Sequence, residues 1–176
     1  AAGLVAVVEY LHLGGEGSAL FSLFTVVTII IGSVAFSGSI VTYLKLQEIM
    51  TTRPVVLPAG KWITILVALG TIASAVWLFV DPQMWVVLLL SVLALAFGVL
   101  FVLPVGGADV PIVISLLNAC TGLAVAASGY VLDNVLLLIA GTLVGASGTL
   151  LTSLMAKAMG RPLTSTLFGA FSGTTQ

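Results

Sequence analysis

Residues 62–103 read WITILVALGTIASAVWLFV, DPQ and MWVVLLLSVLALAFGVLFVL, which are two long apolar runs separated by a short polar turn. Neither run contains a charged side chain, and each is close to the roughly 20 residues that a helix needs to cross a bilayer. Asp81 and Pro82 end the first run, because proline lacks the backbone N–H that continues a helix. This stretch therefore predicts two transmembrane helices joined by a tight turn.

The composition of the whole chain agrees with a membrane protein. Of its 176 residues 60% are hydrophobic, and only six are acidic and five basic. Charged residues make up 6% of the chain, against about 25% in an average soluble domain. This composition excludes a soluble domain. A net charge of −1 with no basic run excludes nucleic-acid partners. The single cysteine, Cys120, and the lack of a Cys/His cluster give no basis for a side-chain metal or redox site.

The apolar segments run from the chain start to about Leu11 and then over residues 19–44, 62–80, 84–103, 110–132 and 134–156. The first is too short to cross alone, and we expect it to be the end of a helix that begins upstream. The others are too long for barrel strands, which need about ten residues. Backbone groups in hydrocarbon must be satisfied internally. We therefore predict an all-α polytopic transmembrane bundle with about five full spans plus a truncated N-terminal helix.

The basic residues predict the orientation of these spans. Alternate crossing places all of them on one side: Lys45, Arg53, Lys61, Lys157 and Arg161. The loops of the other side hold Glu16, Asp81, Asp133 and His12. The positive-inside rule then places the basic side, including the Asp109 loop and the C-terminal tail, in the cytoplasm.

Polar side chains at membrane depth are costly, so each one is a candidate site. Asn118 follows Asp109 by nine residues, which at 1.5 Å per residue places it roughly 13 Å into the bilayer. Ser39 precedes Lys45 by six residues, and the same rise per residue places it roughly 9 Å into the bilayer from the same side. The two side chains could therefore meet. Ser115 shares the face of Asn118. Asn118 either makes a structural bond between helices or belongs to a water-lined station for protons or a small ion.

Small residues repeat on two helical faces. One face carries Thr25, Thr28, Gly32, Ala35, Ser39 and Thr42, and the other carries Gly141, Gly145, Gly148 and Thr152. Such faces are typical of close helix packing in membranes. A glycine-rich helix that bends during function is the alternative.

Two further groups have simple structural interpretations. Asp109 is placed to cap the helix 110–132, or else to contact a soluble partner. His12 is interpreted as an exposed loop histidine. The sequence has no GxGxxG motif after a strand, no P-loop and no nucleophile elbow, so nucleotide chemistry would require another domain.

The stretch from Gly106 to Asn118, GGADVPIVISLLN, resembles the membrane domain of the beta subunit of proton-translocating nicotinamide nucleotide transhydrogenase. The likeness continues through residues 121–122, 126–130, 133–134, 141–148 and 157–161, and with FSGS at 36–39 it covers most of the chain. The resemblance implies hydride transfer between NAD(H) and NADP(H) on soluble domains, coupled to proton movement across a bacterial plasma membrane. It places the family's proton path at Asn118 and Ser39, with Ser115 beside them.

The resemblance also implies contacts with other domains and partners. The coupling residues would be Asp109, Gly141, Gly145, Gly148 and Arg161, and residues 157–176 would begin a linker from a single membrane domain, 1–176, to an NADP(H)-binding domain. The expected partners are an alpha subunit with its NAD(H)-binding domain and transmembrane helices, a second copy in a homodimer, and lipid. The membrane domain itself would bind no cofactor. The family's proton-carrying histidine corresponds to a position a few residues before Ala1, so we expect this chain not to pump by itself.

Two alternatives come from other functional classes. A fragment of a secondary transporter would place a polar substrate site near the midplane and predicts inverted repeats and a broken helix, neither of which is clear in the sequence. A purely structural membrane subunit would tolerate the loss of Asn118.

Overall fold

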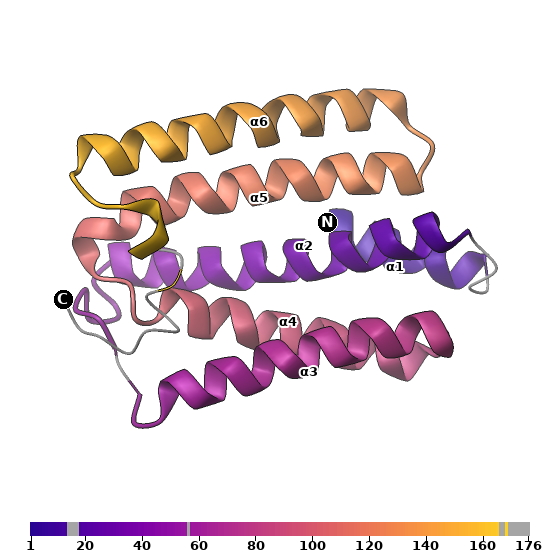
Figure 1. The fold of residues 1–176 in the computed structure, drawn as a ribbon, viewed down its shortest axis with the longest axis horizontal. Helices are drawn as coiled ribbons and strands as arrows, with labels where there is room; N and C mark the ends of the chain where they lie inside the picture. The colour runs from indigo at the N-terminus through magenta and orange to yellow at the C-terminus, as the bar shows by residue number, and fades with distance from the viewer. Residues whose placement is uncertain (14–17, 56, 166–167, 169–176) are drawn as a thin grey trace.

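The computed structural model describes residues 1–13, 18–55, 57–165 and 168, and these residues form helices and short connections without a strand. The helices are α1 (Ala2–His12), α2 (Ala19–Leu46), α3 (Gly60–Val80), α4 (Met84–Val102), α5 (Val110–Val131) and α6 (Val135–Ala158), with a short 3-10 helix η1 (Gly107–Asp109) before α5. Figure 1 shows them lying side by side as a bundle. Each boundary lies within two residues of the one predicted from the sequence.

In the described ranges, five helices, α2 to α6, are long and apolar enough to cross a membrane. α1 has 11 residues, which span roughly 16 Å, or about half of the hydrocarbon thickness. The prediction of five full spans and one short N-terminal helix is therefore confirmed.

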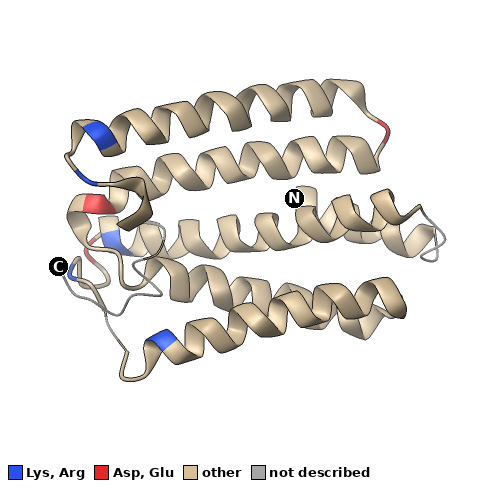
Figure 2. Ribbon diagram, viewed as in Figure 1, with Lys and Arg blue, Asp and Glu red and all other residues tan. Residues whose placement is uncertain are grey.

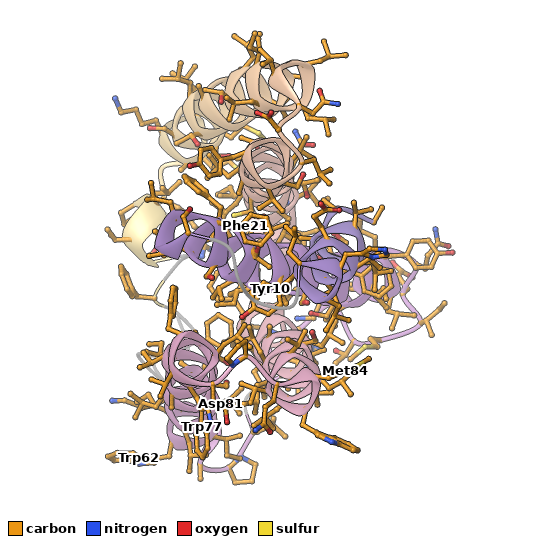
Figure 3. All side chains as sticks on the ribbon, turned by 90° about the vertical axis from the view of Figure 1, so that its right-hand side faces the viewer. Tyr10, Phe21, Trp62, Trp77, Asp81 and Met84 are labelled. Atoms are coloured by element: carbon orange, nitrogen blue, oxygen red, sulfur yellow. The ribbon has the colours of Figure 1, made fainter. Side chains whose placement is uncertain are left out.

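α2 is the central helix of the bundle. It packs against α1, α4 and α5, with the α5–α6 pair on one side of it and the α3–α4 pair on the other (Figure 1). α1 runs antiparallel to α2, and its Tyr10 ring stacks on Phe21 with 6.3 Å between the ring centroids (Figure 3). Gly3 at the other end of α1 lies against Gly32. α1 therefore covers one half of the length of α2.

The charged residues confirm the predicted alternation of the loops. Lysines and arginines gather at one end of the bundle (Figure 2). Asp109 belongs to the same end, because it pairs with Arg161, whereas Asp133 lies in the connection between α5 and α6 at the opposite end. We call the first end the basic end. The assignment of this end to the cytoplasm stays a prediction. Glu16, which we expected in a loop of the other side, lies outside the described residues.

Exposed tryptophans lie near both ends of α3. Trp62 near its start is 70% exposed and Trp77 near its end is 63% exposed (Figure 3). Tryptophan prefers the level of the lipid headgroups, because its ring combines a large apolar surface with a polar N–H group. The two positions fit a helix that crosses from one interface to the other.

α5 and α6 pack through their glycines. A Cβ atom added to Gly122 would lie 2.6 Å from the backbone nitrogen of Gly145, and one added to Gly141 would collide with the backbone of Ala126. Gly148 faces Ala119 in the same way. The backbones of the two helices touch because no side chain stands between them, as the close-packing interpretation predicted.

Most hydroxyl groups within the spans bond to their own helix. Thr28 donates to the carbonyl of Phe24 at 2.7 Å, and Thr42 donates to the carbonyl of Gly38 at 2.8 Å. The same pattern recurs at Thr64, Thr71, Ser91 and Thr121. Such residues need no partner on another helix, so their polarity alone does not mark a functional site.

We predict that Gly141→Ala weakens the α5–α6 contact, because the added methyl group meets rigid backbone. Overpacking of this kind costs about 1–3 kcal/mol. The measurement is the free energy of unfolding in mixed micelles titrated with a denaturing detergent. Gly70→Ala is the matched control, since its Cβ would lie 3.4 Å from the flexible side chain of Leu93. Equal stability of the two variants would contradict the packing described above.

Candidate functional site

Asn118 and Ser39 lie at the same level of the bundle. Leu117, next to Asn118, places its Cδ1 atom 3.3 Å from where a Cβ atom of Gly38 would stand. The expected agreement in depth is therefore confirmed. Both polar side chains are nevertheless exposed, and within the described chain no hydrogen bond joins them. The described helices alone do not bring the two groups together.

The exposure of Ser39 follows from the position of α1. On α2, Thr25 and Thr28 are fully buried, and the backbone of Gly3 stands 3.7 Å from the Cβ position of Gly32. Toward the basic end this face does not stay uniform: Ala35 and Thr42 are buried, whereas Ser39 is exposed together with its neighbours Phe36, Ile40 and Tyr43. Ser39 is therefore exposed where the cover given by α1 stops.

Ser115 is buried and links α5 to α6. Its hydroxyl oxygen lies 2.9 Å from that of Thr152, and Thr152 donates its own proton to the carbonyl of Gly148 at 2.7 Å. A hydroxyl has one proton to donate, so Ser115 is the donor toward Thr152. Ser115 and Thr152 thus form a short hydroxyl chain between the two helices, one turn from Asn118.

Asp109 is paired with Arg161 at the basic end. The Nη1 atom of Arg161 donates to Oδ2 of Asp109 at 2.8 Å, and the two side chains are 43% and 15% exposed. Asp109 does occupy the N-cap position of α5, but its side chain makes no capping bond. The prediction that its carboxylate caps the helix is wrong, because the ion pair takes Oδ2 and Oδ1 has no partner among the described residues. The pair joins the start of α5 to the segment that follows α6.

The comparisons with known proteins show the family of this chain. A family model described as NAD(P) transhydrogenase beta subunit matches residues 1–176. The chain belongs to the NAD(P) transhydrogenase beta subunit family. The curated NAD(P) transhydrogenase subunit beta of Rhodospirillum rubrum is similar to this chain, with 36% identity over 141 residues, which are 80% of the chain and 30% of the relative. The same subunit from a strain of that species gives the same values. The chain thus spans less than a third of the length of these relatives.

The glycines of α6 face α5. Gly141, Gly145 and Gly148 are buried and contact α5. They serve helix packing, and their additional role in coupling stays a prediction. His12 is exposed, as expected, but it is the last residue of α1 and does not lie in a loop.

Lys45 has a role that its place in the sequence did not predict. From the sequence it served only to orient the spans, whereas in the structure its side chain is buried and its ammonium group donates to three backbone carbonyls. The available signal was a basic residue in the last turn of a helix, a position from which lysine often bonds free carbonyls. The carbonyls belong to Val102, the last residue of α4, and to Leu103 and Val105 after it, which are all distant from Lys45 in the sequence.

We predict that Ser115→Ala lowers the stability of the subunit by about 0.6 kcal/mol, the average worth of a hydrogen bond between membrane helices. Combined with Thr152→Val in a double-mutant cycle, it should show a coupling energy of similar size. The readout is again detergent-induced unfolding. Thr121→Val is the control, because Thr121 bonds to its own helix through the Leu117 carbonyl. A coupling energy of zero would show that the Ser115–Thr152 contact is not formed in the membrane.

Proposed function

We propose that this chain is the membrane domain, 1–176, of a transhydrogenase that couples hydride transfer between NAD(H) and NADP(H) to proton movement across the bilayer. The nucleotides would bind soluble domains, and the alpha subunit would supply the NAD(H)-binding domain and further helices. The basic end would face the cytoplasm of a bacterial cell, and the functional unit would be a homodimer. Membership of the family and the five apolar spans support this proposal.

The observation that carries the proposal is the exposure of Asn118 within an apolar span. Its amide has two donors and an acceptor, and none has a hydrogen-bond partner in the described chain. An unsatisfied amide in hydrocarbon costs several kcal/mol, on the order of 4. Asn118 therefore requires a partner from another helix or from water, and a water molecule or a protonatable side chain in that place would be a component of a proton path.

The geometry of α1 indicates where such a partner would come from. Gly3 lies opposite Gly32, and Ser39 lies seven residues further along α2. In an antiparallel pair, the residue facing Ser39 is about seven positions upstream of Gly3. The resemblance puts the family's histidine a few residues before Ala1, which is the same region. We propose that this histidine reaches the level of Ser39 and Asn118, and that the Ser115–Thr152 hydroxyls continue the polar path toward α6.

Coupling to the NADP(H)-binding domain would run through the basic end. Asp109 and Arg161 connect α5 to the segment after α6, and this segment, 157–176, would begin the linker to that domain. Residues 166–167 and 169–176 of this segment lie outside the described residues. The shallow glycine contact of Gly141, Gly145 and Gly148 would let α6 shift against α5 when the protonation state of the path changes.

We predict that Asn118→Leu strongly reduces coupling while leaving the bundle folded. The test uses the full-length protein with its alpha subunit in liposomes, and follows hydride transfer from NADPH to an NAD analogue together with a pH-sensitive dye. Acidification by the variant should fall about tenfold, within the usual range of coupling between sites.

Thr121→Val is the matched control for this assay. Thr121 is also exposed on α5, one turn from Asn118, but its hydroxyl is satisfied within the helix, so pumping should be unchanged. Normal pumping by Asn118→Leu would show that Asn118 has only a structural role and no part in the proton path. A wild-type protein that transfers no hydride would overturn the proposed function itself.

A further inference from the structure

Lys45 is a buried cation held by backbone dipoles. Its side chain is 1% exposed in the last turn of α2. Its Nζ atom donates to the carbonyl oxygens of Val102 at 3.2 Å, Leu103 at 2.6 Å and Val105 at 2.7 Å. An ammonium group has three donors, so all of them are used. Among the described residues the recorded ion pair is Asp109–Arg161, and no carboxylate pairs with Lys45.

The three carbonyls belong to the end of α4 and to the turn after it. The last carbonyls of a helix have no partner within the helix and carry partial negative charge, so a cation placed there binds them well. Lys45, which belongs to α2, thus donates hydrogen bonds to free carbonyl groups at the end of α4. The bond to Val105 extends this attachment past Pro104, into the connection that leads to α5.

The connection 103–109 is fixed at further points before it reaches the ion pair. The N–H of Val55 donates to the carbonyl of Leu103 at 3.1 Å, and the N–H of Gly107 donates to the carbonyl of Thr52 at 2.9 Å. The connection ends at Asp109, where Oδ2 receives the bond from Arg161. Lys45 is the buried charged side chain in this set of contacts, and its three bonds hold the first half of the connection and the helix residue before it.

We propose that Lys45 is a positioning residue for the Asp109–Arg161 ion pair. By holding the start of the connection 103–109 against α2, it places Asp109 where Arg161 can reach it. It also ties this contact to the helix that carries Ser39, which lies six residues, or roughly 9 Å, before Lys45. A shift of α2 along its axis therefore carries Asp109 with it. The part of this inference that links Lys45 to proton coupling rests on the proposed function, whereas the positioning of Asp109 by Lys45 does not.

The geometry is tested by a distance measurement in the full-length protein with its alpha subunit in liposomes. Spin labels are attached at Ala108 and Met159, both exposed and each close to one partner of the ion pair. The native cysteines, including Cys120, are replaced first. Lys45→Met keeps the length of the side chain and removes the charge and the donors. We expect a narrow distance distribution with Lys45 and a wide one with Lys45→Met, similar to that of Asp109→Asn.

Proton pumping by the same proteins tests whether the positioning of the ion pair by Lys45 matters for coupling. Lys45→Met should lower pumping about tenfold, and the double variant with Asp109→Asn should pump no less than the weaker single variant. Lys61→Met is the matched control, because Lys61 is an exposed lysine at the same end and its loss should change neither readout. If Lys45→Met does not accumulate in the membrane, Lys45→Gln is measured in its place with the same expectations.

Each result decides the inference. An unchanged distance distribution in Lys45→Met would overturn the positioning role. A widened distribution with normal pumping, or losses that multiply in the double variant, would overturn the link to coupling. A wild-type protein without hydride transfer would instead remove the proposed function, and the distance measurement would still decide whether Lys45 positions the ion pair.

Discussion

The attachment of α6 to α5 is the contact on which the arrangement of the basic end depends. Within the described elements, α6 packs against α5 and makes no comparable contact with another helix. Lipid tails are as apolar as the side chains of α6, so burial of these side chains gives little energy for association. The helix is instead held where glycines let the two backbones touch and where Ser115 meets Thr152. The place of Arg161, which follows α6, is set by this interface.

The two attachments of the α4–α5 connection have different strengths. The Lys45 side chain is buried, and each of its bonds joins a charge to a carbonyl, a class of hydrogen bond worth about 1.5–3 kcal/mol. The Asp109–Arg161 pair is partly exposed, and such pairs contribute about 0–1 kcal/mol. One side of the connection is therefore firmly held, while the other side breaks and re-forms at low cost. A contact that reports a change of state needs this combination, because it must be well placed and yet reversible.

Helix number and boundaries were predictable because they depend on local properties. Apolar length, the Asp81–Pro82 turn and the basic residues are all read directly from neighbouring positions. The site depended on contacts between distant residues. Asp109 was expected to cap α5, but Arg161, 52 residues away, takes its carboxylate. Lys45 was used only to predict the orientation of the spans, because nothing near it in the sequence shows that carbonyls at the end of α4 lie within reach of its side chain.

Asn118 illustrates the difference between a polar residue that a helix tolerates and one that requires an outside partner. Threonines such as Thr28 and Thr42 return their single proton to a carbonyl of the same helix, and they remain satisfied whatever lies beside them. A primary amide cannot do this completely, since it has two donors and an acceptor to satisfy. Its exposure at the level of Ser39 therefore makes this part of the bundle incomplete as a hydrogen-bonding system. Water or a protonatable side chain would complete it, and either one would bring an exchangeable proton to the level of Ser39 on α2, the helix whose last turn carries Lys45.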